Sequence, residues 1–173
     1  MKIGIMSDSH DHLSYIQRAI HVFIENKVDK IVHCGDMVAP FIKRAMGELD
    51  HAKNIEVIGI YGNNDGERAG MRKILKGVME IKGDFYQTEW DGLKVAVYHG
   101  TENPLLEGLI HSRKYHLVLC GHTHQLRTEL INDTLVINPG ETCGYLTENA
   151  TCVLLDLSPQ PLTLQNLKVI KLN

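Results

Sequence analysis

The first 75 residues alternate between short apolar runs and segments with helical periodicity, and this alternation restricts the fold more than any other feature of the chain. The apolar runs cover residues 2–6, 30–33 and 55–61, and the helical segments cover 13–24, 39–49 and 67–75. In the first helical segment, apolar side chains recur at the spacing of one face of an amphipathic helix. Because strands that alternate with helices form βαβ units, we expect a parallel sheet in this half of the chain.

The second half of the chain is dominated by predicted strands. Asp91-Gly92, a dipeptide typical of two-residue hairpin turns, joins the first two of them. The predicted strands cover 85–90, 93–99, 116–120, 126–131, 135–138, 150–157 and 162–172, with one helix over 104–112. We expect two mixed sheets packed face to face, with helices outside and a single domain over 1–173.

The composition excludes several classes of protein. A chain with 43% hydrophobic and 23% charged residues is expected to fold rather than stay disordered. The net charge of −3 provides no basic field, so we do not expect nucleic acid as a partner. No apolar run approaches the ~20 residues of a membrane span, and the first apolar run is too short for a signal peptide. We therefore expect a cytoplasmic protein, and the sequence leaves its oligomeric state open.

Five predicted strands end in side chains that can bind metal ions. These side chains are Asp8, His10, Asp36, Asn63, His99, His122 and His124. A glycine stands beside four of the five groups, at positions 35, 62, 100 and 121. Ligands of α/β proteins collect outside the carboxyl ends of the strands, so we expect the five loops to meet at one crevice.

The chemistry of these side chains indicates a metal site. Imidazole, carboxylate and carboxamide groups suit divalent manganese, iron, nickel and zinc, and the absence of cysteine argues against a structural zinc site. Each short motif alone has a simpler explanation as a helix cap or a turn. Five such motifs at successive strand ends are not explained in this way. Seven ligands are too many for one tetrahedral ion and suit two ions that share one carboxylate. Outside this set, His33 is expected to be structural, whereas a role for His12 at the rim of the site is left open.

The four cysteines, at positions 34, 120, 143 and 152, lack the close spacing of a zinc knuckle. We expect them to be buried, reduced thiols that behave as small hydrophobic side chains.

The ordered pattern D-x-H, G-D, G-N-x-D, H-G and G-H-T-H resembles the calcineurin-like metallophosphoesterase superfamily, and most closely its small prokaryotic phosphodiesterases. The resemblance implies a four-layer αββα sandwich and a binuclear metal centre. One ion would be held by Asp8, His10, Asp36 and His124, and the other by Asp36, Asn63, His99 and His122. The catalytic candidates are Asp36, Asn64 and His99.

The resemblance also implies a function. It predicts a metal-dependent phosphoric diester hydrolase in which a metal-bridging hydroxide attacks the phosphorus of a small phosphodiester. Manganese is the first expectation for the two divalent ions, with nickel, iron and zinc as alternatives. A second hypothesis is a metal-binding or protein-interaction scaffold, because a retromer subunit of the same superfamily serves mainly as such a platform.

Position 64 departs from the pattern of the superfamily, which has histidine there as a proton donor to the leaving group. Asn64 has no titratable proton near neutral pH. We therefore expect a preference for good leaving groups, such as those of aryl phosphodiesters. Asp65 and His12 are the two neighbouring groups considered as replacement acids.

Overall fold

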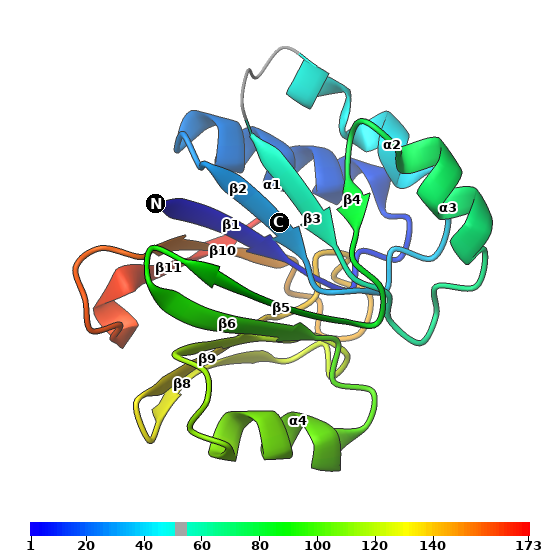
Figure 1. The fold of residues 1–173 in the computed structure, drawn as a ribbon. Helices are drawn as coiled ribbons and strands as arrows, with labels where there is room; N and C mark the ends of the chain where they lie inside the picture. The colour runs from blue at the N-terminus through cyan, green and yellow to red at the C-terminus, as the bar shows by residue number, and fades with distance from the viewer. Residues whose placement is uncertain (51–54) are drawn as a thin grey trace.

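Two mixed β-sheets pack face to face in the computed structural model, which describes residues 1–50 and 55–173 (Figure 1). The first sheet has the strand order β11-β10-β1-β2-β3-β4. Its strands are β1 (Lys2–Met6), β2 (Lys30–His33), β3 (Glu56–Gly59), β4 (Glu80–Ile81), β10 (Thr151–Asp156) and β11 (Leu167–Lys171). Strands β1 to β4 are parallel, and β10 is antiparallel to both of its neighbours.

The second sheet has the strand order β5-β6-β7-β9-β8. Its strands are β5 (Phe85–Trp90), β6 (Leu93–Tyr98), β7 (Leu117–Leu119), β8 (Leu126–Ile131) and β9 (Thr134–Pro139). The β5–β6 hairpin turns at Asp91-Gly92, where both residues have positive φ, as a type I′ turn requires. Strands β6, β7 and β9 are parallel.

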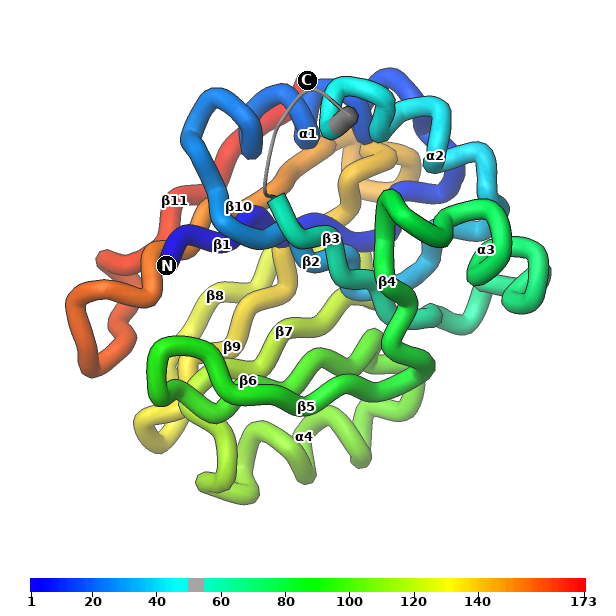
Figure 2. The backbone as a smooth tube through the Cα atoms, turned by 45° about the horizontal axis from the view of Figure 1, so that its top comes forward, coloured from blue at the N-terminus to red at the C-terminus, as the bar shows by residue number. Residues whose placement is uncertain are grey.

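Helices cover the two outer faces of the paired sheets (Figures 1 and 2). Three of them lie over the first sheet: α1 (Leu13–Glu25), α2 (Ile42–Ala45) and α3 (Arg68–Leu75). Helix α4 (Asn103–His111) lies over the second sheet. The expected four-layer αββα sandwich is therefore confirmed. Among the helices of the described residues, none combines the length and hydropathy needed to cross a bilayer.

Strand β1 shows how the alternation along a strand builds the layers. Ile3 and Ile5 point into the core between the two sheets, whereas Met6 belongs to the core beneath the helices. At Gly4 an added Cβ would lie 2.5 Å from the ring of Phe23 in α1. Glycine at this position therefore lets α1 pack closely onto the sheet.

The structure differs from the predicted elements in three places. The helix predicted over 39–49 is broken into α2 and a 3₁₀ turn at Gly47–Asp50, because Gly47 disfavours helix propagation. Strand β4 was not predicted, since two residues carry no alternation pattern. The strand predicted over 162–172 begins only at Leu167, because Leu164–Asn166 forms a 3₁₀ turn capped by Thr163.

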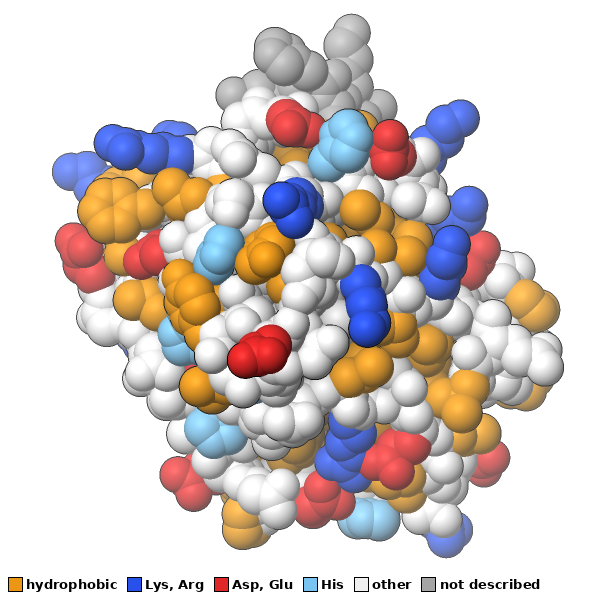
Figure 3. Space-filling model, turned by 180° about the vertical axis from the view of Figure 1, so that it is seen from behind, with side chains coloured by type: hydrophobic (Ala, Val, Ile, Leu, Met, Phe, Trp, Pro, Cys, Tyr) orange, Lys and Arg blue, Asp and Glu red, His pale blue; other side chains and the backbone are white. Residues whose placement is uncertain are grey.

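Charges of both signs are mixed on the face seen from behind. Lys and Arg side chains alternate there with Asp and Glu and with hydrophobic side chains (Figure 3). This distribution matches the small net charge of −3.

Candidate metal centre

The loops that follow β1, β2, β3, β6 and β7 meet at one end of the sandwich. Backbone hydrogen bonds join them in pairs. The amide of Asp8 donates to the carbonyl of Gly35 at 3.0 Å, and the amide of Gly121 donates to the backbone carbonyl of His99 at 2.9 Å. The amide of His122 donates to the Asp8 carboxylate at 3.1 Å, which connects the two sheets. The predicted convergence of the five loops is therefore observed.

Four of the candidate ligands form a first donor group. In Asp8, His10, Asp36 and His124, one donor atom from each residue lies within 4.8 Å of the others. Asp8 and Asp36 are 0% and 1% exposed. The Nε2 atom of His10 lies 3.6 Å from Oδ2 of Asp36, and its ring stacks on that of His124.

The other candidate ligands form a second donor group around Asn63. Its Oδ1 atom lies 2.8 Å from Nδ1 of His122 and 3.2 Å from Nε2 of His99. The same Nε2 atom of His99 lies 3.3 Å from Oδ2 of Asp36. One carboxylate, that of Asp36, therefore belongs to both groups.

The backbone is strained at most of these positions. Asp8, His10, Asp36, His122 and His124 have φ values between 40° and 71°, in the left-handed region that side-chain-bearing residues seldom adopt. Such a conformation costs about 1–3 kcal/mol where it is not relieved and concentrates at functional sites. The concentration of strained residues here indicates that the loop conformations serve to place the donor atoms rather than to minimise the energy of the backbone.

Burial and hydrogen bonding shift the ionisation of this site in opposite directions. Burial raises the pKa of the Asp8 carboxyl, which the nearby His99 ring offsets only in part. Burial alone would also raise the pKa of Asp36, but hydrogen bonds from His99 and Asn64 outweigh it and hold that pKa well below its usual value. Burial alone would lower the pKa of His99, but the two carboxylates outweigh it and raise that pKa. The site is thus a buried anionic pocket that attracts positive charge.

The donor set fits a divalent metal ion. The Nε2 atom of His10 is buried and has no hydrogen-bond partner within the part of the chain that the structure describes. Two buried carboxylates beside it would be costly without a compensating cation. Nitrogen and oxygen donors without thiolate are the set that manganese, nickel, iron and zinc share.

Asn64 lies beside the site and its side chain is turned towards Asp36. Its Nδ2 atom donates to Oδ2 of Asp36 at 2.7 Å, and its backbone amide donates to Oδ1 at 2.8 Å. The residue itself is exposed. Asn64 therefore orients the shared carboxylate from the solvent side of the site.

The two residues considered as replacement acids have other partners. The buried carboxylate of Asp65 accepts the backbone amides of Asp36, Val38 and Gly62 at 2.6–3.0 Å. His12 caps α1 and its Nδ1 accepts the amide of Tyr15 at 3.4 Å. Both residues thus organise the loops around the site.

Glu141 adjoins the first donor group, and the sequence patterns did not single it out. It follows Gly140 at the end of β9 and its Oε2 atom lies 2.7 Å from Nδ1 of His124. Burial alone would raise its pKa, but the His124 ring and donors from Thr147 outweigh burial and lower that pKa to about 2. One signal could have found it: a glycine and an acidic residue at a strand end, as at Gly35-Asp36.

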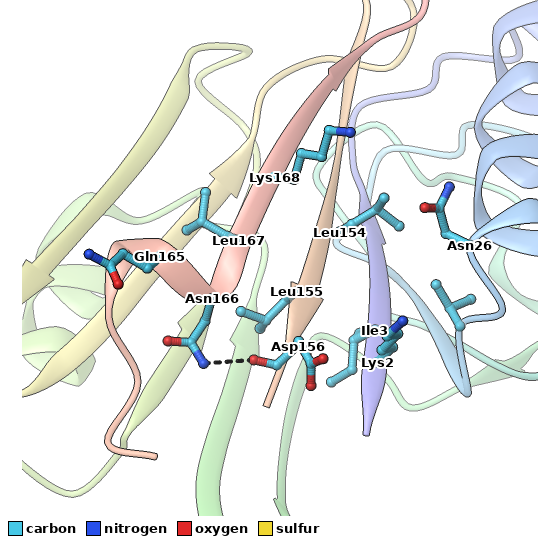
Figure 4. A pocket seen from close by; sticks show the side chains of 11 residues that line it. Lys2, Ile3, Asn26, Leu154, Leu155, Asp156, Gln165, Asn166, Leu167 and Lys168 are labelled. Atoms are coloured by element: carbon cyan, nitrogen blue, oxygen red, sulfur yellow. Dashed lines mark hydrogen bonds between the residues drawn. The ribbon is translucent and has the colours of Figure 1, made fainter. Parts of the chain in front are cut away.

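The cysteines are all buried and free, as expected. A cavity of about 190 Å³ lies at the far end of β1 and β10 and is lined by Lys2, Asp156 and Asn166 among others (Figure 4). None of its lining residues is a candidate ligand. The candidate metal centre is therefore separate from this cavity.

His33 has the structural surroundings that were expected for it, and its burial predicts how the free energy of unfolding depends on pH. The ring is fully buried between Ser9, whose Oγ lies 2.8 Å from Nε2, and the amide of Gly35, which donates to Nδ1. Burial, together with the charge of His99, lowers the pKa of His33 from 6.5 to about 3.

Between pH 6.5 and about 3 the unfolded chain therefore binds a proton at His33 that the folded chain does not. The free energy of unfolding is unaffected by this group above pH 6.5. As the pH drops below that value, the free energy of unfolding decreases by at most about 1.4 kcal/mol per pH unit. Urea unfolding from pH 7 to 4 should show a steeper loss for the wild type than for His33→Asn, in which the amide oxygen can still accept from Gly35. Equal slopes for the two proteins would contradict this assignment.

Comparison with known proteins agrees with the site and the fold. The family model of the calcineurin-like phosphoesterase superfamily domain matches residues 1–160. A phosphodiesterase of Methanocaldococcus jannaschii is 46% identical over 158 residues, which are 90% of this chain and 93% of that protein. A solved structure described as a novel archaeal phosphodiesterase matches with a TM-score of 0.84 and 42% identity, over 99% of both chains.

A more distant match shows the same fold alone. Vps29 from Entamoeba histolytica, solved in complex with Zn²⁺, has a TM-score of 0.63 and 14% identity over 100% of both chains. The family match, the close relatives and the ordered donor residues lead to one conclusion: the chain belongs to the calcineurin-like phosphoesterase superfamily.

Proposed function

We propose that this chain is a binuclear metal-dependent phosphodiesterase that acts on small phosphodiesters. The observation that carries the proposal is the position of Asp36. One of its carboxylate oxygens, Oδ2, lies 3.6 Å from Nε2 of His10 in the first donor group and 3.3 Å from Nε2 of His99 in the second. A carboxylate between two donor groups is what two ions that share a ligand require.

The proposed ligands divide as the two donor groups do. One ion would be held by Asp8, His10, Asp36 and His124, and the other by Asp36, Asn63, His99 and His122. Two divalent ions at such a site lower the pKa of a shared water molecule and stabilise the charge of the phosphoryl oxygens. We expect manganese first, while nickel, iron and zinc suit the same donors.

The chain's own residues prepare the site for this role. The carbonyl of Cys34 lies 2.7 Å from Nδ1 of His99 and can accept a hydrogen bond from it. In the neutral ring, this leaves the lone pair of Nε2 for a metal ion. Asn64 holds the Asp36 carboxylate through two hydrogen bonds. Hydrogen bonds between the loops, from the amide of Asp8 to Gly35 and from that of His10 to Asp36, hold the left-handed backbone at these ligand positions.

The substrate proposal rests on position 64. An amide cannot protonate a leaving oxygen near neutral pH, so that substrates whose leaving group needs no proton should be favoured. The relative that is 46% identical is named a phosphodiesterase, which supports the same class. The net charge of −3 favours a small substrate over a nucleic acid backbone.

Metal analysis with a substrate panel tests the proposal. Protein dialysed against Mn²⁺ should retain about two ions per chain and should turn over an aryl phosphodiester faster than an aryl phosphomonoester and much faster than alkyl esters. Chelation should remove the activity, and added Mn²⁺ should restore it. Absence of bound metal would overturn the binuclear centre, and equal or faster monoester turnover would overturn the substrate class.

The scaffold hypothesis predicts a different result in the same experiment. A protein-interaction platform needs no compensated pair of buried carboxylates, which are costly to retain without a cation. Metal retention without turnover of any phosphoester in the panel would favour the scaffold over the enzyme.

A further inference from the structure

Glu141 is a fully buried carboxylate outside the predicted ligand set that contacts one of its members. It is 0% exposed, and its Oε2 atom lies 2.7 Å from Nδ1 of His124. The other ring nitrogen of His124, Nε2, lies 3.5 Å from Oδ1 of Asp8, inside the first donor group. The histidine ring therefore stands between Glu141 and the candidate metal position.

The two oxygens of Glu141 have different surroundings. Oε1 accepts the hydroxyl of Thr147 at 2.7 Å, together with the amides of Thr147 and Leu146. Oε2 faces His124 and accepts only a weaker bond from the thiol of Cys143 and the shared amide of Leu146, at 3.2 and 3.1 Å. One oxygen thus fastens the loop, and the other is presented to the histidine.

We propose that Glu141 is a positioning residue that fixes the tautomer and orientation of His124 for metal binding. A carboxylate can only accept hydrogen bonds, so the proton of the neutral ring stands on Nδ1 and the lone pair stands on Nε2. Metal-binding histidines commonly have such a carboxylate or carbonyl partner, and loss of it typically costs 10–100-fold in metal affinity. This inference rests on the proposed metal centre.

The same arrangement occurs at a second histidine of the site, with a weaker acceptor. His99 faces the Cys34 carbonyl through Nδ1 and Asp36 through Nε2. Each donor group thus contains one histidine whose Nδ1 atom faces a hydrogen-bond acceptor. At His124 the acceptor is charged, and a hydrogen bond to an ionised acceptor is roughly twice as strong as a neutral one.

Glu141→Gln separates positioning from loop support. Three donors converge on Oε1, so the glutamine oxygen should take that place and its NH₂ group should face His124. The amide then donates to Nδ1 and moves the ring proton to Nε2, which removes the lone pair from the metal position. Nitrogen-resolved NMR of the metal-free protein should show this reversed tautomer. Calorimetry with Mn²⁺ should show about 10–100-fold weaker binding.

Thr147→Val is the matched control, because it removes a donor to the other oxygen of Glu141 and leaves the contact with His124 in place. It should lower the melting temperature while the His124 tautomer stays as in the wild type. If Glu141→Gln keeps both the wild-type tautomer and the wild-type affinity, Glu141 merely fastens the loop and the proposal is wrong.

The wild type alone also decides the matter, should the variant fail to fold. A metal-free wild type with the His124 proton on Nε2 overturns the positioning role directly. A wild type with the proton on Nδ1 that binds no Mn²⁺ supports the orientation of the ring and instead overturns the metal-dependent function. The two ideas can therefore fail separately.

Discussion

Replacing Asp36 with Asn is expected to remove metal binding and to lower phosphodiester turnover by about 10³-fold or more, because a two-metal site depends on its shared anionic ligand. Asp36 is the residue common to both donor groups, with Oδ2 3.6 Å from the His10 ring and 3.3 Å from the His99 ring. An amide supplies one neutral oxygen where the carboxylate supplies two charged ones. Both proposed ions should therefore be affected by a single substitution.

The substitution should leave the fold in place. Asn has the size of Asp, and its amide oxygen can still accept one of the two bonds that come from Asn64. The backbone amide of Asp36 remains bound to Asp65. Circular dichroism should therefore match the wild type, while metal analysis and turnover of an aryl phosphodiester should fall to background.

Asp156→Asn is the control for this experiment. It removes a carboxylate from the first sheet at the end opposite the candidate metal centre, where Asp156 accepts the amide of Ser158. Metal content and turnover should be those of the wild type. If Asp36→Asn retains two ions and near-wild-type activity, the shared-ligand arrangement is wrong.

The layers of the fold were predictable because the relevant signals are local. Alternation of apolar residues along a strand and helical spacing in α1 depend on neighbours in sequence, as in Ile3, Ile5 and Ile16. The order of donor residues was equally visible, because each follows its own strand. Membership of the superfamily confirms the expectation of an enzyme that hydrolyses phosphoesters. The roles of the individual ligands stay predictions.

What the sequence could not supply are contacts between distant segments. Glu141 reaches His124 across 17 residues, and the pairing depends on how the loop after β9 folds back on the loop after β7. The orientation of Asn64 towards Asp36 spans 28 residues. The length of helix α2 was also not predictable. The apolar spacing over 39–49 favours a longer helix, but Gly47 has low helix propensity and the helix ends before it.

Replacing Asn64 with His is expected to raise turnover of substrates with poor leaving groups, by about 10²-fold for alkyl phosphodiesters, because general acid catalysis commonly contributes 10²–10⁴-fold. Asn64 is exposed beside the site, and its backbone N–H donates a hydrogen bond to Oδ1 of Asp36. A histidine there would carry a proton that titrates near neutral pH. The turnover of aryl phosphodiesters, whose leaving groups depart without protonation, should rise little.

The dependence of rate on leaving-group pKa is the measurement that tests this idea. It should be steep for the wild type and shallower for Asn64→His, with a new fall in rate on the alkaline side as the introduced imidazolium loses its proton. Asn64→Ala is the matched control, because it removes the bond to Oδ2 of Asp36 without adding an acid. If alanine flattens the dependence as much as histidine does, the effect comes from freeing Asp36. A missing proton donor would then no longer explain the substrate preference.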